Sequence, residues 1–232
     1  MALALVALAG CSDRDVGSSV DPRIADASRP LVCVTYPTVP PLSYRDSSGE
    51  IVGKEVDLAR RIAAKLGRKL VVEGVEFNEI LRRLKAGTAD MGIATITITE
   101  PRRRDVDFSV PYASDGTCFL YRKDAAKPYM SQIATRRIGV EADTVGDLYL
   151  CRHGGDPMRF SNLEDALTAL ESNKIDAVFS DAPQMATLAA KNGRFATTPL
   201  VTRDWYGVAV DKRRPDVLAA ANAVIAEGGV RK

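Results

Sequence analysis

Short apolar segments alternate with amphipathic segments along most of this chain, and that alternation limits the fold more than any other feature. Residues 31–34 form an apolar run of strand length, and residues 55–66 carry apolar side chains at helical spacing. A strand at 69–73, a helix at 76–86 and a strand at 90–94 follow. This order predicts an α/β sheet of parallel type with right-handed crossovers.

The second half of the chain repeats this pattern. Ser161 and Glu164 have the spacing of a capping box, which predicts a helix start, and a strand is predicted at 175–179. A shift of 86 positions superimposes the first half on the second and places Thr95 on Asp181, each just after a predicted strand. Because open α/β sheets bind ligands beyond the carboxyl ends of their strands, we expect two lobes with a site between them.

We therefore expect an α/β fold of two lobes joined by a two-strand hinge. The first lobe is predicted to contain residues 31–114 together with 206–232, and the second lobe residues 115–205. The two crossings are expected beside Gly116 and Gly207, where glycine suits a backbone that bends when the lobes close.

The polar segment that begins at Thr95 is the strongest candidate site. Thr95 and Thr97 alternate with isoleucines, so both hydroxyls are expected on one side of an extended strand. Thr99 and Pro101 then have the pattern of a helix start, and Arg102 lies on its first turn. A guanidinium beside hydroxyls and backbone amides can bind both oxygens of a carboxylate, so this segment predicts a carboxylate site.

The string TITITEPRRRDVDFS at 95–109 resembles the "TITxxR…VDFS" signature of the periplasmic amino-acid-binding proteins of ABC importers, solute-binding protein family 3. The resemblance implies the type II periplasmic-binding-protein fold. It also implies a protein that captures a polar L-amino acid between closing lobes and delivers it to an ABC transporter permease. Further matches follow in family order over roughly residues 31–228, at 41–42, 49–53, 56–59, Phe77, Leu84, Gly87, Asp90, 139–140, Thr144 and 176–181.

The resemblance implies a role for five polar residues. Arg102 would bind the α-carboxylate of the ligand and Asp181 its ammonium group, since burying a zwitterion requires a partner for each charge. Thr95 and Thr97 would complete this cage, and Thr144 would open a helix whose free amides face the ligand. The alternatives are structural: Asp181 and Thr144 as helix caps, and Arg102 as a solvated charge.

The side chain of the ligand is expected to meet Phe77, Tyr36 and Glu141. Phe77 matches the apolar wall residue of the family, with burial in the core as the competing interpretation. Tyr36 stands where receptors for polar ligands often carry aspartate, Val39 replaces an aromatic lid, and Glu141 occupies a position that reaches toward the ligand. A polar or cationic ligand fits this set, although the missing aspartate argues against lysine and arginine.

The N-terminal segment resembles that of an exported lipoprotein. A short apolar run ends in LAGC at residues 8–11, which resembles a lipobox, and Cys11 would be acylated. Residues 12–29 are rich in Ser, Asp and Arg, so residues 1–30 are predicted to comprise a signal and a flexible tether. We expect a lipid-anchored protein in the periplasm or at an extracytoplasmic membrane surface, with no other membrane contact.

The remaining cysteines and the charge exclude several functions. Cys33 is expected to be a buried free thiol, while Cys118 and Cys151 could pair in an oxidising compartment. No two cysteines are close in sequence and His153 is the only histidine, so no metal and no cofactor are predicted. A net charge of +2 with scattered basic residues predicts no nucleic-acid partner.

Two rival functions remain open from sequence. The periplasmic cyclohexadienyl dehydratases resemble these receptors, and such an enzyme would need a general acid, for which Glu141 is the plausible carboxylate besides Asp181. A binding module that informs a sensor is the second rival. We predict a monomeric binding protein without catalytic activity. The chain ends at Lys232, whereas related receptors usually carry one helix beyond the one predicted at 216–227.

Overall fold

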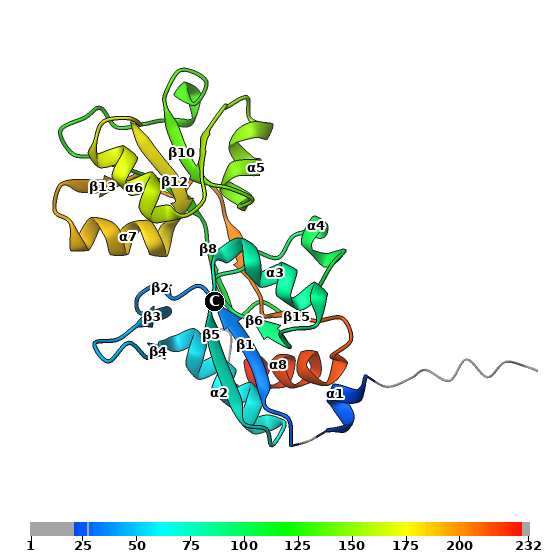
Figure 1. Cartoon of the computed structure of the whole chain (residues 1–232). Helices are drawn as coiled ribbons and strands as arrows, with labels where there is room; N and C mark the ends of the chain where they lie inside the picture. The colour runs from blue at the N-terminus through cyan, green and yellow to red at the C-terminus, as the bar shows by residue number, and fades with distance from the viewer. Residues whose placement is uncertain (1–20, 27, 229–232) are drawn as a thin grey trace, which may run out of the picture.

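The structure is a computed structural model, which describes residues 21–26 and 28–228. Two α/β lobes lie one above the other in Figure 1 and are joined by a narrow ribbon. Two strands far apart in sequence form this ribbon, β8 (Ala113–Asp115) and β14 (Asp204–Tyr206), and they pair antiparallel. The predicted class, two α/β lobes with a two-strand hinge, is confirmed, whereas the predicted boundaries of the lobes stay a prediction.

The sheet of the first lobe has five strands, of which one is reversed. In spatial order they are β5 (Leu70–Gly74), β1 (Leu31–Thr35), β6 (Met91–Gly92), β15 (Ala209–Val210) and β7 (Asp107–Phe108). β5 and β6 are parallel to β1, whereas β15 is antiparallel to both of its neighbours. A small antiparallel sheet lies beside them, made of β2 (Thr38–Val39), β3 (Ser43–Arg45) and β4 (Ile51–Val52).

The sheet of the second lobe has the same arrangement. In spatial order its strands are β11 (Met158–Phe160), β10 (Ile138–Glu141), β12 (Ala177–Asp181), β9 (Thr117–Arg122) and β13 (Phe195–Thr197). Here β9 is the reversed strand. The expectation of a parallel sheet is thus wrong for one strand in each lobe. In both lobes the reversed strand is the first one after the chain crosses the ribbon, so it enters its sheet from the opposite direction.

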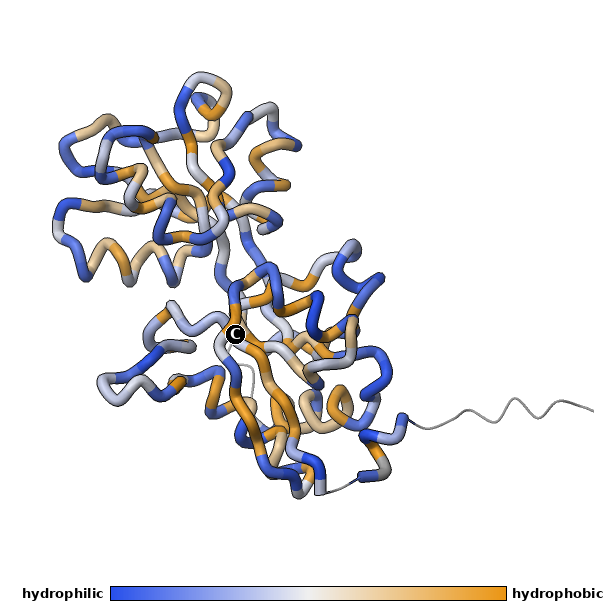
Figure 2. Tube along the Cα trace, viewed as in Figure 1, coloured by the Kyte–Doolittle hydropathy of each residue, from blue (hydrophilic) through white to orange (hydrophobic). Residues whose placement is uncertain are grey.

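Helices cover both faces of each sheet. The long helices are α2 (Lys54–Lys65), α3 (Phe77–Ala86) and α8 (Pro215–Glu227) in the first lobe and α5 (Val145–Arg152), α6 (Leu163–Glu171) and α7 (Ala182–Lys191) in the second. α2 and α8 pack on one face of the first sheet and α3 on the other, with Cys33 and Val34 of β1 pointing to opposite faces. Figure 2 shows the resulting apolar interior of each lobe.

One local expectation is wrong for a hydrogen-bonding reason, and the surroundings of Gly116 add a steric constraint that was not expected. Asn162 rather than Ser161 caps α6, because Asn162 directly precedes the first helical residue and its Oδ1 accepts from the amide of Asp165 at 2.9 Å. Gly116 allows close approach of the two crossings, and the bending expected there during closure stays a prediction. A Cβ at this position would lie 2.0 Å from the carbonyl oxygen of Thr202, so only glycine lets the two crossings pass.

The predicted tether is also wrong for its last residues. Asp21 caps a single helical turn, α1 (Pro22–Ala25), and the guanidinium of Arg23 reaches Oδ2 of Asp211 at 2.7 Å and the carbonyl oxygen of Gly87 at 3.1 Å. The Asp211 side chain is only 2% exposed. Charge pairing with a buried carboxylate thus replaces the apolar packing that this segment lacks. The lipobox and Cys11 lie outside the described residues.

We expect Arg23→Ala to lower the free energy of unfolding by about 1.5–3 kcal/mol, the usual range for hydrogen bonds to charged groups. Urea denaturation measures this change. The control is Arg60→Ala, which breaks an exposed ion pair with Asp57 and should cost about 0–1 kcal/mol. Equal losses in the two variants would contradict a stabilising role for the docked segment.

The described thiols are all free. Cys33 and Cys118 are buried and Cys151 is exposed, so the prediction for Cys33 is confirmed and the possible bond between Cys118 and Cys151 is not formed. Among the described helices, none has both the length and the apolar character needed to cross a membrane. Nor do three acidic, cysteine or histidine side chains gather closely enough to hold a metal ion within residues 21–26 and 28–228.

Candidate ligand-binding site

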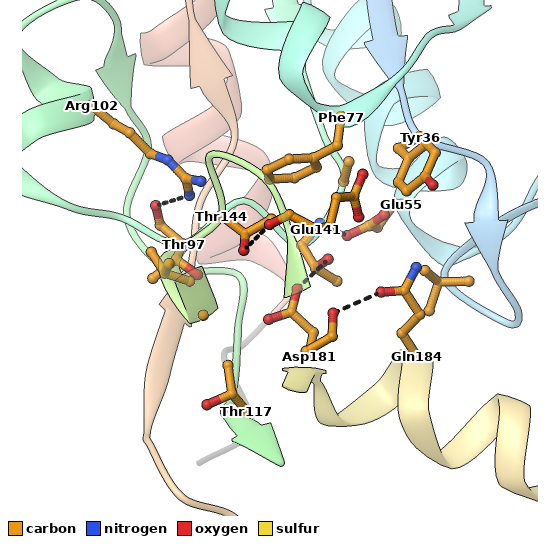
Figure 3. A pocket seen from close by; sticks show the side chains of 16 residues that line it. Tyr36, Glu55, Phe77, Thr97, Arg102, Thr117, Glu141, Thr144, Asp181 and Gln184 are labelled. Carbon is orange, nitrogen blue, oxygen red and sulfur yellow. Dashed lines mark hydrogen bonds between the residues drawn. The ribbon is translucent and has the colours of Figure 1, made fainter. Parts of the chain in front are cut away.

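A cavity between the two lobes brings together all eight residues that the sequence predicted as ligand contacts (Figure 3). The first lobe supplies the arginine, the aromatic residues and two threonines, and the second lobe supplies two acids and a threonine. They are Tyr36, Phe77, Thr95, Thr97, Arg102, Glu141, Thr144 and Asp181. Their joint placement is a structural observation, while their roles toward a ligand stay predictions.

The backbone around Thr95 differs from the extended strand that was expected. β6 ends at Gly92, and Thr95 has a positive φ of 47°, which β-branched residues rarely adopt. Because the backbone turns at Thr95, the two threonines do not follow strand alternation. Thr95 donates its hydroxyl to Oδ2 of Asp181 at 3.5 Å, and Thr97 contributes its carbonyl oxygen, which accepts from Nη1 of Arg102 at 3.0 Å.

Arg102 is held at the edge of the cavity by its helix and by Phe77. The predicted cap is confirmed: Thr99 precedes α4 (Glu100–Arg103) and its hydroxyl accepts from the amide of Arg102 at 3.4 Å. The guanidinium carbon lies 5.4 Å from the ring centre of Phe77. Burial lowers the pKa of Arg102, whereas the negative charges of Asp181 and Asp204 raise it and offset part of this effect. A partly buried guanidinium with donors still free favours a carboxylate receptor over a solvated charge.

Asp181 ends β12 and occupies the N-cap position of α7, yet its side chain makes no capping hydrogen bond. The carboxylate instead points toward the cavity and accepts from Thr95. Burial and then the charge of Asp204 raise the pKa of Asp181 to about 7, and the charge of Arg102 opposes them. These observations argue against a capping role and favour a site for a cationic group, whose charge would offset the desolvation.

Thr144 caps a helix and also lines the cavity, while its role toward a ligand stays a prediction. Its hydroxyl accepts from the amide of Asp147 at 3.3 Å, so it caps α5, and it donates to the carbonyl oxygen of Glu141 at 2.8 Å. Capping is therefore confirmed. The same residue lines the cavity together with Gly146, the second residue of that helix.

Glu141 lies toward the opposite end of the cavity from Arg102, close to Tyr36 in Figure 3. It is 6% exposed, and its carboxylate makes no hydrogen bond or ion pair with any described residue. Burial, together with the charges of Glu76 and Asp181, raises the pKa of Glu141 to about 8. Phe77 packs on the apolar cluster around Ile80 and also lines the cavity, so both interpretations of Phe77 fit the structure.

Sequence reasoning missed four polar residues of this cavity: Glu55, Thr117, Ser180 and Gln184. Glu55 continues the helical spacing of the buried residues Ala59 and Ile62, and that spacing was a usable signal. Gln184 is buried on α7, where it donates from Nε2 to the hydroxyl of Thr38 at 3.2 Å. This contact joins the two lobes across the cavity, and only the fold reveals it.

The fold and the site together define a class of protein. A cavity between two hinged lobes, with one cationic side chain and three carboxylates that have no ion-pair partner within residues 21–26 and 28–228, is typical of two-lobed solute receptors.

Comparison with known proteins defines the family. Residues 31–228 match the profile of bacterial extracellular solute-binding proteins, family 3, and the chain belongs to this family. The arginine-binding periplasmic protein of Mannheimia haemolytica is 27% identical over 202 residues, which cover 84% of this chain and 83% of that protein. The L-cystine-binding protein TcyJ of Escherichia coli K12 is 28% identical over 196 residues, which cover 82% of this chain and 74% of that protein.

Solved structures confirm the type II two-lobed fold. The arginine-bound form of truncated ArgBP from T. maritima superimposes with a TM-score of 0.83 at 29% identity. The match covers 90% of this chain and 100% of that structure's chain. The arginine-bound Gly52Ala mutant of the same protein gives a TM-score of 0.81 at 30% identity, and the match covers 86% of this chain and 95% of the mutant's chain.

Proposed function

We propose that this extracytoplasmic solute-binding protein captures an L-amino acid with a cationic side chain between its lobes and delivers it to an ABC transporter permease. Arg102 binds the α-carboxylate, and Asp181 binds the ammonium group with help from Thr95. The side chain of the solute then extends along Phe77 toward Tyr36 and Glu141. Each charge of the solute meets a group of opposite sign, as burial requires.

The buried carboxylate of Glu141 is the observation that supports a cationic side chain. An unpaired carboxylate in a cavity is costly unless it is protonated or a cation neutralises it. A guanidinium or ammonium group at the end of the solute would supply that cation. The absence of aspartate at position 36 argued against such a solute from sequence, but Glu141 offers the missing negative charge from the other lobe.

The comparisons support the same proposal. Several similar proteins and structures carry names that specify arginine, histidine, glutamine or cystine, and the solved structures with bound arginine are among them. These proteins are binding proteins rather than enzymes, which favours transport over a dehydratase activity. We accordingly assign no catalytic step to Glu141 or Asp181 and propose a monomer that works with a permease.

Calorimetric titration with the twenty standard amino acids and with prephenate-like acids tests this proposal. We expect L-arginine or L-lysine to bind most tightly, and scattering to show a smaller radius of gyration in the complex because the solute joins both lobes. Trp205, the single tryptophan, lies half exposed on β14, so its fluorescence offers a second measure of closure. Binding of a prephenate-like acid with its conversion to product would contradict the transport role.

We further propose that the mature chain begins at an acylated Cys11 and is held at the extracytoplasmic membrane surface. The lipobox-like string at 8–11 supports this proposal. Detergent partitioning of the protein made in a bacterial host with lipoprotein export should place wild type in the detergent phase and Cys11→Ser in the aqueous phase. Cys33→Ser is the matched control, because Cys33 is buried and should not affect partitioning. Wild type that remains aqueous and unacylated would contradict the anchor.

A further inference from the structure

Glu55 is a buried acid that makes two strong hydrogen bonds behind the cavity. It lies in the first turn of α2 and is 3% exposed. A single oxygen, Oε1, accepts from the backbone amide of Thr95 at 2.8 Å and from the hydroxyl of Tyr112 at 2.5 Å. Buried carboxylates are retained where their hydrogen bonds matter, so the two donors indicate what this side chain holds in place.

The first donor belongs to the most strained backbone position at the site. Thr95 is held at a φ of 47° although it is β-branched, and such a conformation persists only where the surroundings fix it. Its amide bond to Glu55 ties this turn to α2. The conformation of this turn orients the Thr95 hydroxyl toward Asp181, which we propose as the ammonium site.

The second donor belongs to the start of the hinge. Tyr112 directly precedes β8, and its backbone amide donates to the carbonyl oxygen of Tyr206 on β14 at 3.0 Å. Its ring packs on the apolar core of the first lobe, so the side chain is anchored there. Glu55 therefore joins a cavity residue to the point where both hinge strands enter the first lobe.

We propose that Glu55 is a positioning residue of the solute site, which fixes the Thr95 turn and links it through Tyr112 to the hinge, so that solute affinity and lobe closure both depend on it. This inference rests on the proposed function. It requires no direct contact between Glu55 and solute, although Glu55 borders the cavity.

Titration with L-arginine tests the first part. Glu55→Ala should weaken binding by about 10- to 100-fold, as is common when a group that orients a ligand-binding residue is removed. Glu55→Gln should recover most of that loss, because an amide oxygen accepts the same two bonds. The losses of Glu55→Ala and Thr95→Ala should be strongly non-additive, since Glu55 acts through Thr95. Asp57→Asn, on the exposed face of the same helix, is the matched control and should bind as wild type does.

Two results would overturn this role. Unchanged affinity in Glu55→Ala would show that the turn needs no support. Equal weakening in Glu55→Ala and Glu55→Gln, with additive losses, would show that the charge acts on the solute directly.

Hydrogen exchange without any solute tests the link to the hinge and keeps the inference separate from the proposed function. Glu55→Ala should raise exchange at the Thr95 amide and across 113–115 together, and Asp57→Asn should raise neither. If Glu55→Ala fails to fold, Tyr112→Phe replaces it, because it removes only the hydroxyl, and exchange across 113–115 should still rise. Protection that equals wild type at both places overturns the inference, even if L-arginine fails to bind wild type.

Discussion

Arg102→Ala is expected to weaken binding of the amino acid by roughly 200- to 5,000-fold. Removing one partner of a buried charge pair costs about 3–5 kcal/mol, because the carboxylate of the solute is left without a cation in a desolvated cavity. Nothing else in the described cavity replaces it, since Arg102 is the one basic side chain that lines this cavity. Calorimetric titration of wild type and variant measures the difference in affinity.

A conservative change at the same position should also fail. Arg102→Lys keeps the charge but loses the planar fork that bonds both carboxylate oxygens and the carbonyl oxygen of Thr97, so most of the loss should persist. Arg103→Ala is the control, because Arg103 belongs to the same helix but pairs with Glu100 outside the cavity. Affinity close to wild type in Arg102→Ala would disprove the carboxylate site.

Glu141→Gln is expected to remove the preference for a cationic side chain. L-arginine and L-lysine should bind about 30-fold or more weakly, the usual loss when one member of a buried charge pair is neutralised. L-glutamine, which carries no charge on its side chain, should change by only a few fold. Glu164→Gln, on the surface of α6, is a control for the loss of one negative charge. Equal losses for all three amino acids would contradict the assignment of Glu141 to the side chain.

The carboxyl of Glu141 should also make the binding of a cationic amino acid depend on pH. Its pKa of about 8 without solute means that the site holds a proton near neutral pH, and a cation must displace that proton. Affinity for L-arginine should therefore rise with pH from 6 toward 8 and then level off. In Glu141→Gln a smaller rise should remain near pH 7, where Asp181 still titrates. A flat pH profile in wild type would count against these raised pKa values.

The stability of the solute-free protein should change in the opposite sense. The pKa of Glu141 is raised above its ordinary value of 4.5, so its protonated form stabilises the folded state below pH 4.5. That contribution is lost as the pH rises through 8. Unfolding temperature should fall over this range in wild type and fall less in Glu141→Gln.

Much of the architecture could be predicted because strands and helices leave periodic signals. Residues 31–34 and 55–66 were placed correctly to within one residue, and the helix cap at Thr99 follows from short-range chemistry. The reversed strands β9 and β15 could not be predicted in the same way. Their direction depends on where the chain crosses between lobes, which is a property of the whole fold and not of any local segment.

The candidate site was predictable in its members but not in its geometry. Arg102 and Asp181 could be named from their positions after strands and from the family resemblance. The positive φ of Thr95 and the support from Glu55 arise from contacts between residues 40 positions apart, which no local pattern encodes. Arg23 was misjudged for a similar reason, because its partner Asp211 lies 188 positions away.

The docking of α1 makes the N-terminal segment part of one lobe rather than a free linker to both. Arg23 and the bond from Arg68 to the carbonyl oxygen of Ile24 make the segment from Asp21 part of the first lobe, on the side away from the second lobe in Figure 1. If the chain is anchored through its N-terminal side, as we propose, the anchor holds the first lobe in place. Rotation about β8 and β14 then appears as a displacement of the second lobe. Under the proposed function, a permease would then detect solute through the changed spacing between the first lobe and the second.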